Sequence, residues 1–107
     1  MPPLPKLPDP PAAQAPGRWV YFVCYRSSVK IGSARNPARR IADLQCGSPV
    51  HLTVLGVMPG DLDFERELHK RWAEHRLRGE WFSLTPEIRQ FIKQNCSKSP
   101  QDYTPTP

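Results

Sequence analysis

The chain has 107 residues, a formal net charge of +5, 14 prolines and three cysteines. This length allows one domain, and no stretch approaches the roughly eighteen apolar residues of a membrane-spanning helix. The N-terminus also lacks the apolar core of a secretory signal. We therefore expect a cytoplasmic protein with no membrane partner.

The cysteines fit that location. Cys24, Cys46 and Cys96 are an odd number and show no CxxC spacing. Such a set is typical of reduced thiols rather than of a disulfide framework or a zinc site.

The prolines divide the chain. Seven of the fourteen lie in residues 1–16 and three follow Ser99, whereas every Trp and Phe lies between these ends. We expect a disordered proline-rich tail in residues 1–17, a folded domain in residues 18–95 and a second disordered tail in residues 96–107. Residues 4–8 resemble a proline-rich ligand, so the first tail is either a site for a protein partner or a solvated spacer.

The positive charge lies in the expected domain. Residues 18–95 hold 13 basic and 8 acidic residues, a difference of +5 that equals the charge of the whole chain. A small basic domain favours a polyanionic partner, and DNA is the first candidate.

The domain opens with two predicted strands. Residues 19–25 are β-branched and aromatic, which is typical of a buried or half-buried strand. After a short turn, Val29 and Ile31 alternate with Lys30, so Lys30 should point to the opposite face from these two side chains. Gly32 ends this second strand in the prediction.

A basic helix is predicted next, over residues 37–46. Asn36 supplies an N-cap and Pro37 occupies the first helical position. Arg39 has Asp43 four residues later, within reach of an ion pair. Arg40 has no acidic residue at that spacing and is therefore free to bind something else.

The rest of the domain alternates between strands and helices. We expect a third strand over residues 51–58, a helix from Asp61 to about His75, a short strand after the turn at Gly79, and a last helix that begins after Thr85.

Glu65 stands out on the second helix. It borders the apolar stripe of that helix, and no Lys or Arg lies three or four residues away. Two interpretations stay open. Glu65 pairs with His69 or with an arginine distant in sequence, or it is a catalytic or metal-binding carboxylate, because a partly desolvated carboxylate needs a cation.

Four blocks of this sequence occur in the order found in a known family. They read VYFV, VKIGSARNPARRIADLQCGSP, FERELHKRW and GEWF, and together they resemble the GIY-YIG nuclease superfamily, in particular its phage-associated branch with KIG as the second motif. The resemblance implies a small α/β (α+β) domain in which helices flank a three-stranded antiparallel sheet. It also implies a DNA endonuclease that uses Mg²⁺ or Mn²⁺.

The resemblance assigns roles to particular residues. Tyr21 matches the tyrosine of the first motif, Arg40 the catalytic arginine and Glu65 the metal-binding glutamate. Tyr21 would orient or deprotonate the attacking water, and as a base it would need a pKa below its usual value of about 10. We expect Lys30 and Arg40 to lower that pKa. His69, one turn after Glu65, would position water or phosphate, or simply contact Glu65.

Lys30 replaces the second tyrosine of the superfamily, and it can bind phosphate but cannot act as a phenol. The predicted catalytic set is Tyr21, Lys30, Arg40, Glu65 and His69, and the predicted DNA-binding set is Lys30, Arg35, Arg39 and Arg40. Trp81 and Phe82 are expected in the core. The alternatives are a catalytically silent DNA-binding module and an adaptor that acts through its proline-rich tail.

Overall fold

The computed structural model describes residues 17–96 of the chain. The tails predicted over residues 1–17 and 96–107, and the proline-rich segment proposed for a protein partner, fall almost entirely outside these residues. Among the helices described, none has the length and apolar character needed to cross a membrane.

The described residues form a five-stranded antiparallel sheet with strand order β3-β1-β2-β5-β4. Its strands are β1 (Trp19–Tyr25), β2 (Ser28–Ala34), β3 (Thr53–Pro59), β4 (Arg76–Arg78) and β5 (Trp81–Ser83). The expectation of a three-stranded sheet was therefore wrong.

The error lies in the hairpin of β4 and β5, which extends the sheet beyond β2. Helix α2 (Leu62–Arg71) is shorter than expected, and the segment that we assigned to its end is a 3₁₀ turn, η1 (Ala73–His75). Strand β4 follows directly, and Gly79, whose φ is +55°, turns the chain back into β5. Glycine suits this left-handed conformation because it has no side chain to clash with the backbone.

The three helices begin where the sequence predicted. Helix α1 spans Pro37–Cys46 and helix α3 spans Pro86–Asn95. The side chains of Asn36, Asp61 and Thr85 each accept a hydrogen bond from a backbone N–H in the first turn of the helix that follows. These caps satisfy donors that would otherwise lack a partner.

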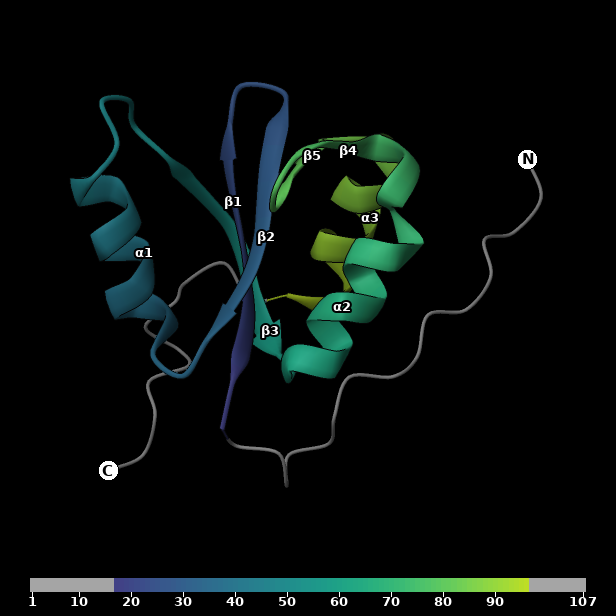
Figure 1. The fold of residues 1–107 in the computed structure, drawn as a ribbon, viewed down its shortest axis with the longest axis horizontal. Coiled ribbons are helices and arrows are strands. Elements are labelled where there is room, and N and C mark those ends of the chain that lie inside the picture. Colours follow the sequence, from purple (N-terminus) through teal and green to yellow (C-terminus); the bar gives the residue numbers. More distant parts are fainter. Residues whose placement is uncertain (1–16, 97–107) are drawn as a thin grey trace.

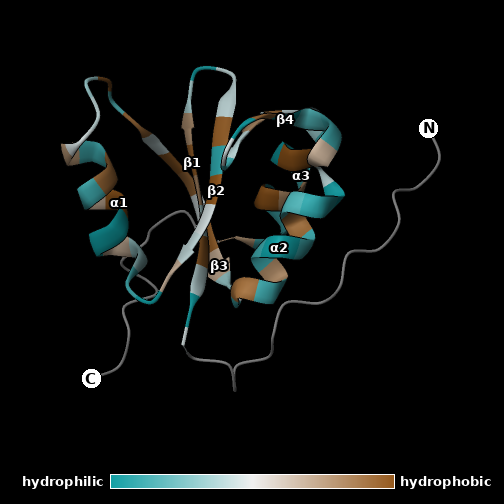
Figure 2. Ribbon diagram, in the orientation of Figure 1, coloured by the Kyte–Doolittle hydropathy of each residue, from teal (hydrophilic) through white to brown (hydrophobic). Residues whose placement is uncertain are grey.

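The sheet separates two helical layers (Figure 1). Helix α1 lies on one side, and α2 and α3 lie on the other. The larger core fills the space under α2 and α3, and a smaller core lies under α1. Hydrophobic colours follow the central strands and α3, whereas α1 and α2 are largely hydrophilic, as expected of helices with one face in water (Figure 2).

A polar contact joins α2 to α3 at the edge of the larger core. Trp72, which is 1% exposed, donates its indole N–H to Glu87 Oε2 at 2.7 Å, and the Arg71 guanidinium lies 3.3 Å from the same oxygen. The acidic Glu87 also lies in the first turn of α3, where it complements the helix dipole.

The Glu87→Ala variant should lower the free energy of unfolding by about 1–3 kcal/mol, because it leaves the indole N–H without its acceptor. Urea denaturation measures this change. Glu74→Ala is the matched control, since the Glu74 side chain is 80% exposed and its loss should cost less than about 0.5 kcal/mol. Equal stability of the two variants would show that the contact contributes nothing.

Candidate active site at the open edge of strand β2

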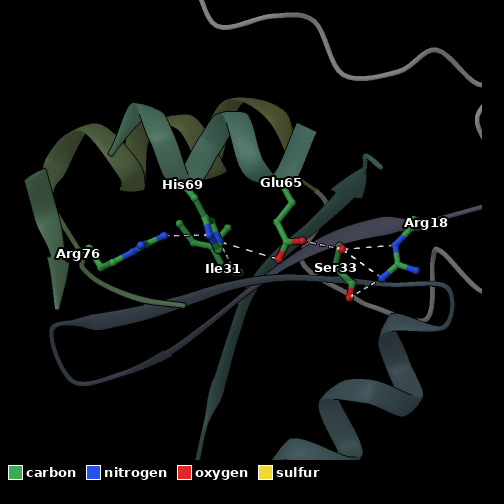
Figure 3. Close-up of polar contacts among 6 residues, drawn as sticks. All are labelled: Arg18, Ile31, Ser33, Glu65, His69 and Arg76. Carbon is green, nitrogen blue, oxygen red and sulfur yellow. Dashed lines mark hydrogen bonds and ion pairs between the residues drawn. The ribbon is translucent and has the colours of Figure 1, made fainter. Parts of the chain in front are cut away.

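Strand β2 is paired with β5 over only part of its length. Their ladder covers residues 28–30, and one further bond runs from the Ile31 N–H to the Glu80 carbonyl at 3.0 Å. Within the described part of the chain, no strand pairs with residues 32–34 on that edge. Helix α2 lies over this part of β2, and the side chains of Glu65 and His69 point down toward the strand (Figure 3).

Gly32 allows two polar groups to meet at this edge. It lies opposite Tyr21 in the β1–β2 ladder. A Cβ atom at Gly32 would lie 2.6 Å from Tyr21 Cζ and 2.9 Å from Glu80 Oε2, and it would overlap the Tyr21 hydroxyl. The phenol and the carboxylate therefore both approach the Gly32 backbone, which only glycine permits.

Glu65, His69 and Glu80 form a compact cluster beside this glycine. One donor atom from each lies within 4.8 Å of the others. The Glu65 side chain is 13% exposed, and its Oε2 accepts a hydrogen bond from the Ser33 hydroxyl at 3.0 Å. For the Glu80 carboxylate, the described residues provide neither a hydrogen bond nor an ion pair. Two carboxylates that lie this close and partly out of water favour the binding of a cation.

His69 is held by the backbone rather than by Glu65. Its Nε2 lies 2.8 Å from the Ile31 carbonyl oxygen, and its Nδ1 lies 3.3 Å from a guanidinium nitrogen of Arg76 (Figure 3). A carbonyl only accepts and a guanidinium only donates, so Nε2 carries the proton and Nδ1 presents its lone pair to Arg76. Glu65 Oε1 is 3.9 Å from Nε2, a secondary contact.

This tautomer leaves His69 without a free lone pair for a metal ion. The carboxylates of Glu65 and Glu80 therefore remain as the donors of the cluster. The question that the sequence left open is answered in part, because the helical neighbour His69 is not the main partner of Glu65.

An arginine from outside the helix does reach Glu65, although indirectly. Arg18 donates to the Ser33 hydroxyl and carbonyl at 3.3–3.4 Å, and the same hydroxyl donates to Glu65 Oε2 (Figure 3). Ser33 thus fixes one carboxylate oxygen and leaves Oε1 directed toward the cluster. The sequence allowed for an arginine distant in the chain but could not identify it, because Arg18 and Glu65 are 47 positions apart.

Arg40 reaches the site from α1. Its guanidinium contacts the Tyr21 hydroxyl, and this hydrogen-bonding contact lowers the pKa of the phenol. Burial, which is the larger effect, raises that pKa, and the negative charges of Glu80 and Glu65 raise it further. The pKa of Tyr21 is thus above its usual value of 10.0, whereas we had expected Lys30 and Arg40 to bring it below.

Three variants, Tyr21→Phe, Glu80→Gln and Arg40→Ala, test these electrostatic effects. The ultraviolet absorbance change of tyrosine ionisation is measured against pH, and the titration of Tyr21→Phe is subtracted to isolate the signal of Tyr21. Without divalent ions, Tyr21 should ionise above pH 10, later than an unfolded tyrosine. Its contribution to the free energy of unfolding should therefore fall from about pH 10, where a tyrosine of the unfolded chain ionises, and level off once Tyr21 of the folded protein has ionised. Glu80→Gln should lower the pKa of Tyr21, and Arg40→Ala should raise it. Shifts of the opposite sign would contradict this arrangement.

The structure brings together Tyr21, Arg40, Glu65 and His69 around Gly32, but it places Lys30 elsewhere. The Lys30 ammonium lies over the ring of Trp81, 5.8 Å from the ring centroid. Arg35 and Arg39 are exposed near the start of α1, and the structure shows no ion pair between Arg39 and Asp43.

Sequence reasoning missed Glu80 as a site residue. We treated the GEWF block as a turn followed by core residues, although Glu80 directly follows the turn glycine. Its position became meaningful only when the β4–β5 hairpin was placed against the edge of β2.

These features define a small basic α+β domain with a tyrosine, an arginine and two carboxylates at one strand edge. The sequence model of the T5orf172 domain matches residues 18–96. The chain belongs to this family, and the match covers the whole sheet, the three helices and the site. A search of curated proteins and a search of solved structures each found no match.

Proposed function

We propose that this protein is a metal-dependent DNA endonuclease of the GIY-YIG type, from the branch with KIG as its second motif. One observation carries the proposal. Tyr21, Arg40 and Glu65, which come from three different elements, converge with Glu80 around the bare backbone of Gly32. DNA as the partner and a cytoplasmic location belong to the same proposal.

The two carboxylates fit a hard divalent cation. Mg²⁺ prefers oxygen donors and usually takes only one or two protein carboxylates. Oε1 of Glu65 and the carboxylate of Glu80 would hold Mg²⁺ or Mn²⁺, whereas the resemblance had indicated Glu65 alone. When bound, the ion would supply positive charge to the scissile phosphate and to the oxygen that leaves.

Arg40 and Tyr21 would act beside these carboxylates, since Tyr21 and Glu80 both approach Gly32 and Arg40 contacts Tyr21. Arg40 is exposed on α1, and its planar guanidinium suits two-point binding of phosphate oxygens. In the protein without a metal ion the pKa of Tyr21 is raised, so the phenol is protonated near neutral pH and can orient the attacking water by hydrogen bonding. The hydrogen bond from His69 to the Ile31 carbonyl would anchor α2 to β2 and thereby hold Glu65 at its distance from the strand.

A second candidate is a catalytically silent DNA-binding module. Lys30 favours it, because its ammonium lies over Trp81 and therefore does not take the place of a second phenol beside Tyr21. Such a module would bind DNA through its basic groups, with an affinity that falls as salt rises.

A plasmid assay separates the two functions. The full chain is incubated with supercoiled plasmid in Mg²⁺, in Mn²⁺ and in excess EDTA, and DNA binding is measured in EDTA by fluorescence anisotropy. The proposal expects nicked or linear plasmid in Mg²⁺ or Mn²⁺ and intact plasmid in EDTA. Salt-dependent binding without cleavage in either ion would overturn the nuclease and favour the silent module.

A further inference from the structure

Among residues 17–96, no helix covers the β4–β5 end of the sheet on the α1 side. The core under α1 is built from residues of α1 and strands β1, β2 and β3, and it includes none from β4 or β5. Figure 1 shows the β4–β5 hairpin on the far side of β2 from α1. In the described part of the chain, this face of the hairpin is therefore uncovered.

An aromatic ring and two cations lie in one row across this face. Trp81 pairs with Lys30 of β2 on one side and with Arg78 of β4 on the other. Directly paired residues project to the same face of a sheet. The pairing of β4 with β5 is irregular between Arg76 and Arg78, but Arg78 and Trp81 are the pair that flanks the two-residue turn, so all three side chains share this face. Arg78 is exposed, Trp81 is half-exposed, and Trp81 packs in neither core.

The expectation that both aromatic residues of the GEWF block belong to the core therefore holds only for Phe82, which is 0% exposed. A large aromatic ring left partly in water between two cations is the arrangement that nucleic-acid-binding proteins use for unpaired bases. Each base stacks on a ring, and the flanking phosphates bind to Lys or Arg.

We propose that Trp81 is a stacking platform for an unpaired base of the DNA substrate, and that Lys30 and Arg78 bind the phosphates on either side of that base. This inference rests on the proposed function, because it places the platform beside the centre that would cut the strand. It gives Lys30 a role that does not require it to replace a tyrosine.

The platform adjoins the candidate active site. Glu80 directly precedes Trp81, and Lys30 lies two residues before Gly32 on the same face of β2, about 7 Å along the strand. A DNA strand that has one phosphate bound to Arg40 would therefore place a neighbouring nucleotide over the ring of Trp81. In intact duplex the bases are stacked inside the helix, so the preferred substrate is DNA with an unpaired base next to the cleaved bond.

Two substitutions at one position test the stacking. Trp81→Phe keeps a flat aromatic face, whereas Trp81→Leu keeps apolar volume without one. Binding of the full chain to labelled oligo(dT) and to a duplex of equal length is measured by anisotropy in EDTA, so that no cleavage occurs. Trp81→Leu should bind oligo(dT) on the order of tenfold more weakly than the parent, Trp81→Phe should keep most of the affinity, and duplex binding should change less than about twofold.

The charges of the row are tested in the same way. Arg78→Ala should weaken oligo(dT) binding, whereas Lys93→Ala, which removes an exposed cation from α3 on the opposite side of the sheet, should not. Unchanged oligo(dT) binding by Trp81→Leu overturns the platform, and so does an equal loss for oligo(dT) and duplex. Because binding is measured in EDTA, this test is independent of cleavage. The stacking proposal can be wrong while the plasmid assay still shows cleavage, and it can be right for a protein that does not cut DNA.

Discussion

The Glu65→Gln variant should cut plasmid more than about a hundredfold more slowly than the parent in Mg²⁺, because a ligand of the proposed ion loses its charge. Stabilisation by a bound ion amounts to several kcal/mol in the transition state, and each 1.36 kcal/mol is a factor of about ten in rate. Glutamine keeps the shape of the side chain and can still accept the hydrogen bond from Ser33. The fold should therefore survive, and loss of the repulsion from Glu80 should leave the melting temperature equal or higher.

Glu67→Gln is the matched control for this experiment. Glu67 is exposed on the same helix, and the structure shows no contact between Glu67 and the site, so its substitution removes the same charge from the protein without touching the residues around Gly32. Its cleavage rate should stay within about twofold of the parent, as expected of a surface substitution. If Glu65→Gln cuts as fast as this control, the carboxylate has no role in catalysis.

Arg40→Ala should lower the cleavage rate by about 10²–10³-fold, the usual effect of removing one donor that stabilises charge in the transition state. DNA affinity should fall much less, because many basic groups share the contact with the phosphate backbone. Arg40→Lys should recover only a small part of the rate, since an ammonium cannot bind two phosphate oxygens in one plane. Single-turnover cleavage of a labelled oligonucleotide separates the rate from the affinity.

The neighbouring arginine provides the comparison. Arg39 is equally exposed on α1, one residue away, and the structure shows no contact between Arg39 and Tyr21. Arg39→Ala should weaken DNA binding slightly and leave the single-turnover rate within about twofold of the parent. Equal losses from Arg39→Ala and Arg40→Ala would mean that the two arginines act only through their charge.

Local sequence signals were enough to predict most elements of this fold. The β1–β2 hairpin follows from alternating apolar residues, and helices α1 and α3 follow from a capping residue that precedes a proline. Strand β4 could not be predicted in this way, because it has only three residues, all of them exposed, which is too short a stretch to establish an alternating pattern. It exists through its pairing with β5, a contact that no local pattern reveals.

The same distinction between local and tertiary contacts separates the site residues that could be predicted from those that could not. Arg40 was noticed because no acidic residue lies four positions away in its helix, and Glu65 because no Lys or Arg lies three or four positions away. Both are local properties. Glu80 gains its position from the bond between its carbonyl and Ile31, and His69 gains its tautomer from the Ile31 carbonyl and Arg76. These are tertiary contacts. The burial of Tyr21 and the negative charge of Glu80 beside it are tertiary effects as well, and they explain why the direction of the Tyr21 pKa shift was predicted wrongly.

The proposed nuclease depends on a divalent ion that binds between the carboxylates of Glu65 and Glu80. The most direct test is the rate of plasmid nicking as a function of Mg²⁺ concentration, for the parent and for Glu80→Gln. Glu80→Gln should need at least about tenfold more Mg²⁺ for its half-maximal rate, because loss of a ligand contact weakens metal binding. The same Mg²⁺ dependence for both proteins, or a parent that does not cut at any Mg²⁺ concentration, would contradict it.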